Sequence, residues 1–559
     1  MAKQGGKVGV LLYQENARTP PTEKTTTMKN IITAAIIIIA SINSYASTVW
    51  NGQVSNEWSN ASNWSAGVPD ATSDAVIAAS SSNNASVSGS ATCHAIEIAQ
   101  GGVVEIASGA VLNVYGDIIN NGNFDASIGK VNFAGVSHIS DYITFNDITI
   151  NGTLYAPSSV IDVRGTWENN GVFINGMGSV QFSGQTNIIG SAITSFYNVY
   201  VGGEMTSHPI AINVKGNFMN NGTFHHNNGT VVMNGNTNQS IGIGSVTEFY
   251  NLAVSNPNYG VCMTSDIIIN NKLSLMSGYV NVFTYTLIIN NNDPKAVERM
   301  NGFVISETIA ASGYSFMKWN IGTGKGTYIY PFATNGNHDY VPVTVEISAP
   351  GMGNGSLEIA TYRTDDANNP YPTTVTGVND STGADISAQA VDRFWISRVE
   401  GFTVSPVSAI SFTASESEIG FNNDLVAAKW NGASWISASS SQEHLNHGTR
   451  ASDMSDYSIF MLVDENGVDA APVISGVQNT QEEQVKIYPT AISSSESIHV
   501  KGIAGSAMMQ VIDMQGRVVM TQSVDNNASV SMSDMASGMY FAQVVANGQM
   551  HSEKIVVAQ

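Results

Sequence analysis

The stretch Gly165-Thr-Trp-Glu-Asn-Asn-Gly-Val-Phe173 decides the expected fold, because two close copies of it occur elsewhere in the chain. They are Gly116-Asp-Ile-Ile-Asn-Asn-Gly-Asn-Phe124 and Gly216-Asn-Phe-Met-Asn-Asn-Gly-Thr-Phe224, which begin 49 residues earlier and 51 residues later. Each copy is followed by a glycine and a short apolar segment that again ends in glycine. A fixed period over three copies indicates a repeat architecture.

The segments within each repeat have the length and chemistry of β-strands. Short apolar runs alternate with Asn-Asn-Gly and Asn-Gly corners, whose residues tolerate a left-handed backbone, and no helical periodicity interrupts them. The pattern predicts an all-β chain with a right-handed parallel β-helix, or solenoid, of about two coils per repeat. Phe124, Phe173 and Phe224 are expected to stack above one another, and burial of each contributes on the order of 2 kcal/mol. A propeller with one blade per repeat is the alternative, although three copies are fewer than the usual blade number.

We place the solenoid repeats at residues 101–298 and expect a cap before them at residues 47–100. The cap segment holds Trp50, Trp58 and Trp64 close together in the sequence. A solenoid needs a cap at each open end, and three large apolar rings could cover the first coil. A platform on which sugar rings stack is the alternative interpretation of the same tryptophans.

The chain changes character after the repeats. Residues 299–466 alternate aromatic and β-branched residues with longer loops, which predicts a β-sandwich. Residues 467–484 are polar with Gly and Pro, so we expect a linker. The two cysteines, Cys93 and Cys262, lie several coils apart in a solenoid, beyond the reach of a disulfide, and we expect both to be small buried apolar residues.

The start of the chain has the features of a secretory signal at residues 28–46. Met28-Lys29-Asn30 is a short basic start, Ile31–Ile42 is apolar, and Ser44-Tyr45-Ala46 fits a small-x-small cleavage site. The apolar run is too short to span a bilayer, which takes about 20 residues. We expect Met28 to be the true initiator and residues 1–27 to be an upstream translation artefact.

The composition excludes several classes of partner. The formal net charge is −22, which argues against nucleic acid and anionic lipid, because both require a cationic surface. Charged residues make up only 12% of the chain, about half of the usual share, and Asn, Ser, Thr and Gly take their place. Uncharged polar side chains suit stacked β surfaces, where ladders of like charge would repel.

The end of the chain, from Val485 onward, carries a series of short motifs in a fixed order. Val-Lys-Ile-Tyr-Pro is followed by Asp-Met-Gln-Gly-Arg, by Met-Ala-Ser-Gly-Met-Tyr and by a basic-then-apolar end. This order resembles the type A C-terminal sorting domain of proteins exported by the type IX secretion system of Bacteroidota, and we place that domain at residues 485–559. Thr490 and Ala491 depart from the family's Tyr-Pro-Asn-Pro opening. The matching residues are Tyr488, Pro489, Asp513, Gly516, Arg517, Gly538, Tyr540 and Lys554.

The resemblance implies a small Ig-like β-sandwich that the export machinery of the outer membrane recognises. In the family this domain is then cleaved and often replaced by a lipopolysaccharide anchor, so the mature protein would be extracellular or on the cell surface. Alternating apolar residues agree with half-buried strands, and we expect Gly516 and Gly538 to lie in hairpin turns with positive φ. An ordinary sandwich with no sorting role is the alternative.

Few residues suggest chemistry. Gly322-Thr-Gly-Lys-Gly-Thr327 lacks the spacing of a phosphate-binding loop, and His444 and His447 lack a third metal ligand at a fixed offset. We therefore assign no catalytic, cofactor-binding or metal-binding residues and no cofactor, and we expect that the chain is not an enzyme. One possibility stays open: oxygen ligands suit hard cations, so Asp339, Asp365 and Asp366 could hold Ca²⁺.

These observations predict a secreted, adhesin-like or structural surface protein. A rigid solenoid would present ladders of Asn, Ser and Thr to a glycan, to extracellular matrix or to a neighbouring cell. The second hypothesis is a polysaccharide-active enzyme, or its carbohydrate-binding accessory, on a β-helix. A groove containing acids and bases with strongly shifted pKa values would favour the enzyme.

Overall fold

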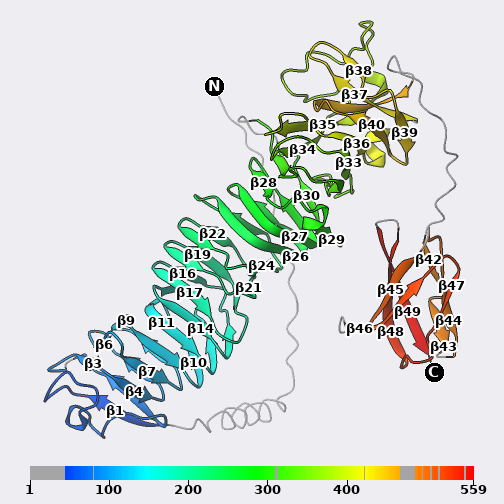
Figure 1. The fold of residues 1–559 in the computed structure, drawn as a ribbon. Helices are drawn as coiled ribbons and strands as arrows, with labels where there is room; N and C mark the ends of the chain where they lie inside the picture. Colours follow the sequence, from blue (N-terminus) through cyan, green and yellow to red (C-terminus); the bar gives the residue numbers. More distant parts are fainter. Residues whose placement is uncertain are drawn as a thin grey trace, which may run out of the picture.

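The structure is a computed structural model and is nearly all β, with 3% helix. Figure 1 shows an elongated stack of coils that runs from β1 at the blue end to β28 in green, followed by a sandwich in yellow-green. The expected upstream segment 1–27, most of the expected signal peptide and the expected linker 467–484 lie outside the described residues. The described residues are 45–79, 81–308, 313–420, 422, 424–465, 485–493, 495–503, 506–513, 517–546 and 549–558.

The β-solenoid has about 12 turns, and its strands stack in parallel from one coil to the next. Val160 pairs with Ser179, and Ser179 pairs with Asn198, so a coil of this part returns to the same position with a sequence period of 19. The strands of this part are β1 (Ala46–Trp50), β2 (Ser73–Ile77), β3 (Ala85–Val87), β4 (Ser90–Cys93), β5 (Ile96–Ile98), β6 (Val103–Ile106), β7 (Val111–Val114), β8 (Ile118–Asn120), β9 (Asn123–Phe133), β10 (Val136–His138), β11 (Ile143–Ile150), β12 (Thr153–Tyr155), β13 (Val160–Val163), β14 (Thr166–Asn169), β15 (Val172–Ile174), β16 (Ser179–Phe182), β17 (Gln185–Ile189), β18 (Ser195–Phe196), β19 (Asn198–Val201), β20 (Glu204–Thr206), β21 (Ala211–Val214), β22 (Phe218–Asn220), β23 (Thr223–His225), β24 (Thr230–Met233), β25 (Gln239–Gly242), β26 (Thr247–Met263), β27 (Ile267–Asn281), β28 (Thr286–Ile289), β29 (Val297–Arg299), β30 (Phe303–Ile305) and β31 (Phe316–Trp319).

The expected relation between sequence repeat and coil is wrong. Phe124 pairs with Val104, Phe173 with Leu154 and Phe224 with Met205, so the three phenylalanines do not stack on one another. The spacing between copies of the Asn-Asn-Gly motif is not a whole number of coils, so the motif recurs at different positions around the coil. All three rings are buried, as expected.

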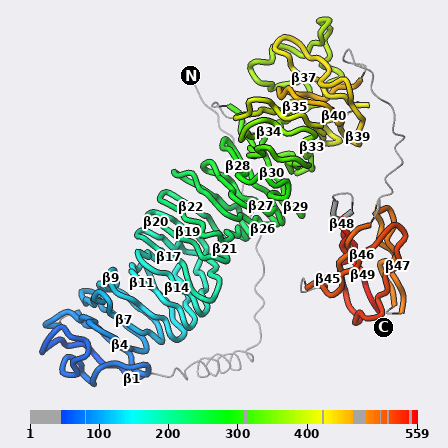
Figure 2. The backbone as a smooth tube through the Cα atoms, viewed as in Figure 1, coloured from blue at the N-terminus to red at the C-terminus, as the bar shows by residue number. Residues whose placement is uncertain are grey.

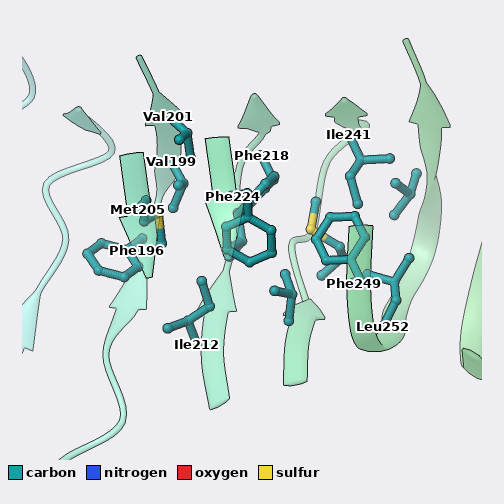
Figure 3. Close-up of a cluster of buried hydrophobic side chains, with 14 of the residues drawn as sticks. Phe196, Val199, Val201, Met205, Ile212, Phe218, Phe224, Ile241, Phe249 and Leu252 are labelled. Carbon is teal, nitrogen blue, oxygen red and sulfur yellow. The ribbon is translucent and has the colours of Figure 1, made fainter. Parts of the chain in front are cut away.

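The interior of the solenoid is filled by aromatic and aliphatic side chains from successive coils. Figure 3 shows Phe196, Phe218, Phe224 and Phe249 pointing into this interior. The ring of Phe218 lies 5.1 Å from that of Phe224 and 5.4 Å from that of Phe249 between centroids, in edge-to-face contact. Such pairs contribute about 0.5–1.5 kcal/mol beyond burial alone.

The segment 51–67 caps the first coil. The rings of Trp58 and Trp64 in this segment and of Trp50 at the end of β1 are buried and packed edge to face, with centroid distances of 5.0 Å from Trp50 to Trp64 and 4.7 Å from Trp58 to Trp64. The backbone of the segment covers two exposed strand edges: the N–H of Ser65 donates to the carbonyl of Val49, and that of Trp58 donates to the carbonyl of Ser86, both at 2.9 Å. The rings pack against each other, so their faces are not available to a sugar.

The opposite end of the solenoid continues into the sandwich through backbone pairing. Strand β28 pairs in parallel with β31, and β31 then pairs antiparallel with β34. Parallel stacking therefore extends past residue 298, where we expected the repeats to end. The remaining elements of this region are β32 (Gly326–Tyr330), β33 (Val343–Ala349), β34 (Ser356–Arg363), β35 (Ala390–Glu400), β36 (Val407–Thr413), α2 (Glu416–Ile419), β37 (Leu425–Trp430), β38 (Trp435–Ser437), β39 (Gln442–Leu445), β40 (Gly448–Met454) and β41 (Ile459–Asp464).

Two sheets form the sandwich. One has the order β31-β34-β35-β41-β37-β38, and the other has the order β32-β33-β36-β40-β39. Alternation along the strands places apolar residues such as Val345, Ile410 and Leu462 in the core. Because β31 belongs to both the solenoid and the sandwich, the two parts share one hydrogen-bonded sheet.

The C-terminal domain is a separate small sandwich, drawn in orange and red in Figure 2. A three-stranded sheet β42-β44-β47 faces a five-stranded sheet β43-β49-β48-β45-β46 around its own apolar core, which includes Ile498, Met509, Val544 and Ile555. Its strands are β42 (Lys486–Tyr488), β43 (Ala491–Ser493), β44 (Ser497–Lys501), β45 (Ala507–Asp513), β46 (Val518–Val524), β47 (Ala528–Ser531), β48 (Gly538–Ala546) and β49 (Gln549–Ala558).

Both cysteines are free thiols. Cys93 is fully buried, as expected, and burial raises the pKa of its thiol. Cys262 is only half-buried, which corrects the expectation that it lies in the core. The reason is strand alternation, because its neighbours Val261 and Met263 point inward and Cys262 points outward.

Candidate functional site

A polar groove of about 860 Å³ lies where the solenoid meets the sandwich. We call it the asparagine groove. Its walls come from successive coils at the end of the solenoid and from loops of the sandwich sheet. The lining includes Tyr250, Asn270, Asn290, Asn320, Lys318 and Glu400.

Three asparagines in a row line the groove. Asn290 and Asn320 directly follow β28 and β31, and Asn270 holds the equivalent position within β27. The Nδ2 of Asn290 donates to Oδ1 of Asn270 at 3.0 Å, and the Nδ2 of Asn320 donates to Oδ1 of Asn290 at 2.8 Å. The stacked coils thus hold the amides in one aligned ladder, about 4.8 Å per step.

The charged side of the groove contains one cation between two anions. The ammonium of Lys318 lies 3.0 Å from Oε1 of Glu358 and also donates to Oε2 of Glu400. The hydrogen bond from Lys318 and its positive charge hold the pKa of Glu400 below its usual value. One ammonium and two carboxylates give this wall of the groove a net charge of −1.

Sandwich loops close the remaining side of the groove. The backbone N–H of Gly322 donates to the carbonyl of Gly355 at 2.9 Å and ties the loop after β31 to the start of β34. Gly322 has φ +52°, a left-handed conformation that L side chains rarely adopt. These loops exist only because the parallel stack changes to antiparallel pairing at β31, so the groove is a product of the junction.

A second asparagine ladder occurs nearer the other end of the solenoid, on a surface outside the groove. The Nδ2 of Asn132 donates to Asn113 at 2.8 Å, that of Asn151 to Asn132 at 2.8 Å, and that of Asn170 to Asn151 at 3.3 Å. Neighbouring asparagines of this ladder are 19 residues apart in the sequence, which equals one coil. We did not predict this period, although the regular recurrence of Asn at these four positions was a usable signal.

Two described residues of the expected sorting motif, Asp513 and Arg517, lie at one hairpin of the C-terminal sandwich. Asp513 ends β45, and its Oδ1 accepts from the backbone N–H of Arg517 at 3.0 Å while its Oδ2 accepts from Nε of Arg517 at 2.8 Å. The Asp513 carboxylate is buried and the Arg517 side chain is exposed. This ion pair closes the turn between β45 and β46; Gly516, inside the turn, lies outside the described residues.

The other motif residues have mixed environments. The buried Tyr540 donates from its hydroxyl to the carbonyl of Ala536 at 2.8 Å and fixes the entry of β48. Tyr488, whose peptide bond to Pro489 is cis, and Lys554 on β49 are exposed. Gly538 is the first residue of β48 and its φ is not positive, which corrects our expectation of a left-handed turn at that position.

Neither spanning helices nor metal clusters occur among the described residues. In that part of the chain no helix is long and apolar enough to cross a membrane. Within the same residues, His, Cys, Asp and Glu do not form a group of three or more that could hold a metal ion, Asp339, Asp365 and Asp366 included. His444 instead pairs with Glu465 at 3.5 Å and with the carbonyl of Leu425 at 3.0 Å.

The fold and the C-terminal motifs together define a class of exported, solenoid-bearing protein. Residues 486–558 match the family described as secretion system C-terminal sorting domain. The resemblance inferred from the sequence is thereby confirmed, and the matched tail with the β-solenoid fits a cargo protein of the type IX secretion system. Such a tail implies export to the cell surface or the extracellular space. Neither the curated proteins nor the solved structures contain a significant match.

Proposed function

We propose that this cargo is an adhesin-like surface protein that binds glycan in the asparagine groove. The observation that carries the proposal is the ladder of Asn270, Asn290 and Asn320 inside an open groove. Amide groups both donate and accept hydrogen bonds, as sugar hydroxyls do, and rigid strands hold them at fixed spacing. The ladder therefore offers a preorganised surface that loses little conformational entropy on binding.

The ionisation of the groove favours binding over catalysis. A glycosidase needs two carboxyl groups in different protonation states, one of them an acid with a raised pKa. Glu358 and Glu400 instead share Lys318, and the pKa of Glu400 is lowered. A carboxylate held ionised in this way cannot serve as a general acid at neutral pH, so we propose that the chain is not an enzyme.

We further propose that residues 28–46 direct export across the inner membrane and that the protein stays associated with the outer membrane after the sorting domain has been used. Because the groove lies at the C-terminal end of the solenoid, attachment through the C-terminal side would leave the solenoid projecting outward beyond the groove. Cell fractionation of strains with and without residues 485–559 tests this route. Retention of the truncated protein in the periplasm supports it, and a truncated protein at the surface would refute it.

Glycan binding is tested with the full-length secreted protein on an array of oligosaccharides. We compare the wild type with Asn290→Ala, which removes the middle of the groove ladder, and with Asn151→Ala, which removes an equivalent amide from the distant ladder. Loss of signal in Asn290→Ala alone supports the groove as the binding site. Equal signals from all three proteins would show that glycans bind elsewhere.

A further inference from the structure

If the proposed function holds, the hydrogen-bonding groups of the asparagine groove restrict the class of glycan that it can bind. Asn290 and Asn320 each use one N–H in the ladder, and a primary amide has a second N–H to offer a ligand. The carbonyl oxygens retain a lone pair besides the one used in the ladder. A ligand that both donates and accepts matches this surface, whereas carboxylate and sulfate groups only accept.

The charges around the groove also disfavour anions. Lys318 is neutralised by Glu358 and Glu400, which leaves one net negative charge at that wall. At the other end of the ladder, the Nδ2 of Asn270 lies 3.3 Å from Oε2 of Glu248, a further carboxylate. The whole chain has a formal net charge of −22, so the long-range field repels polyanions before they reach the groove.

The direction of the ladder sets the direction of the ligand. Asn270, Asn290 and Asn320 lie on successive coils, so their amides repeat along the solenoid axis at about 4.8 Å, a step comparable to one sugar ring. Tyr250 lines the same groove and supplies an aromatic ring on which the apolar face of a sugar can pack. A linear chain lying along this axis would meet one amide per sugar.

We infer that the asparagine groove takes a neutral, unsulfated oligosaccharide that lies along the solenoid axis and that it rejects uronate-containing and sulfated chains. This inference rests on the proposed glycan-binding function. It concerns the ligand class, which is decided by the excess negative charge and by the amide ladder. Glu400 is the residue that sets the charge discrimination, because replacing it leaves Lys318 paired with Glu358 alone.

Calorimetric titration of the full-length protein with neutral and uronate oligosaccharides of equal length tests the inference. The wild type is expected to bind the neutral chains and to bind the uronate chains only weakly. Asn290→Ala should weaken that binding by about threefold to tenfold, as expected for one lost hydrogen bond, and Asn151→Ala should leave it unchanged. Glu400→Gln should raise the ratio of uronate binding to neutral binding by about threefold, an effect that salt reduces.

The possible failures are distinguishable. If uronate chains bind the wild type as tightly as neutral chains and Asn290→Ala weakens both, the glycan site stands and the inferred ligand class is overturned. If Glu400→Gln does not change the ratio of uronate to neutral binding, charge does not decide specificity and the inference also fails. If no oligosaccharide binds at all, the proposed function itself is refuted.

Discussion

Arg393 and Glu418 form a bidentate ion pair inside the sandwich, with Nε to Oε2 at 2.9 Å and Nη2 to Oε1 at 2.6 Å. The side chains are 0% and 1% exposed. Nη2 of Arg393 also donates to Glu307, and its Nη1 donates to the hydroxyl of Thr361 at 2.8 Å. Glu418 in turn accepts from the backbone N–H of Ser415 at 2.9 Å in the capping box of α2. A charge cluster in which every group has partners thus links β35 to α2.

Replacing Arg393 by Met is expected to destabilise the sandwich by about 3–5 kcal/mol, because it leaves the buried carboxylates of Glu418 and Glu307 without a counter-charge. Hydrogen exchange of peptides from β35 and α2 measures the loss locally. Arg450→Met is the matched control, since the Arg450–Glu346 pair is at the surface and contributes about 0–1 kcal/mol. Equal protection in both variants would contradict the role of Arg393.

The same cluster predicts a response to acid. Burial alone would raise the pKa of Glu418, but hydrogen bonds from Arg393 and Ser415 and the charge of Arg393 outweigh burial, so its pKa lies below the usual value of 4.5. A depressed pKa contributes stability that is fully present above the unfolded pKa and is lost as pH falls through the folded one. As the pH falls below that usual value, the stability of the wild type should therefore decrease more steeply than that of Glu418→Gln, as measured by denaturation curves. Parallel curves would contradict the prediction.

The solenoid could be predicted from sequence, but its coil length could not be read from the repeats. The corner motif recurs in the segments that begin at Gly116, Gly165 and Gly216. Any corner of a coil accepts Asn-Asn-Gly, so the spacing of the motif need not match a whole number of coils. The register is instead set by contacts between coils, such as the hydrogen bond from Asn151 to Asn132, which requires the two side chains to lie above one another. The alternation of residues within one strand does not show which residue of the next coil lies above it, so it does not reveal the coil length.

The asparagine groove could not be predicted from the sequence either, and the reason is different. Its walls include Tyr250 from the solenoid and Glu400 from the sandwich, which are far apart in sequence and meet only because β31 joins the two sheets. The pairs Asn270-Asn271 and Asn290-Asn291 were a usable signal, since they recur one coil apart. The sorting motif was predictable because its residues form local turns, such as the one closed by Asp513 and Arg517.

Removing one large ring should damage the solenoid only locally. Trp167 is fully buried, lies 4.9 Å from Phe173 and 5.2 Å from Phe196 between ring centroids, and donates from Nε1 to Thr194 at 3.1 Å. Trp167→Ala is expected to lower the stability of the surrounding coils by about 3–5 kcal/mol. Because each coil contacts only its neighbours, protection from hydrogen exchange should fall in β11 to β18 and persist in β1 to β5. The control Met177→Ala, at an exposed site, should change stability by about 0.5 kcal/mol or less. Uniform loss of protection along the chain would contradict local stacking.

The turn closed by Asp513 should be needed for export. Asp513→Asn removes the charge and one of the two oxygens that accept hydrogen bonds from Arg517, so the β45–β46 hairpin loses its closure; the exposure of Arg517 limits the cost in stability to about 1 kcal/mol. Because the fold is retained at that cost, a fall in the exported fraction would report on recognition of the turn. Glu553→Gln, at an exposed position of β49, makes the same change in charge within the same domain and should be exported normally. Each variant is quantified in the periplasm, the outer membrane and the medium, in a strain where deletion of residues 485–559 blocks export. Export of Asp513→Asn at the wild-type level would show that the machinery recognises another part of the sandwich.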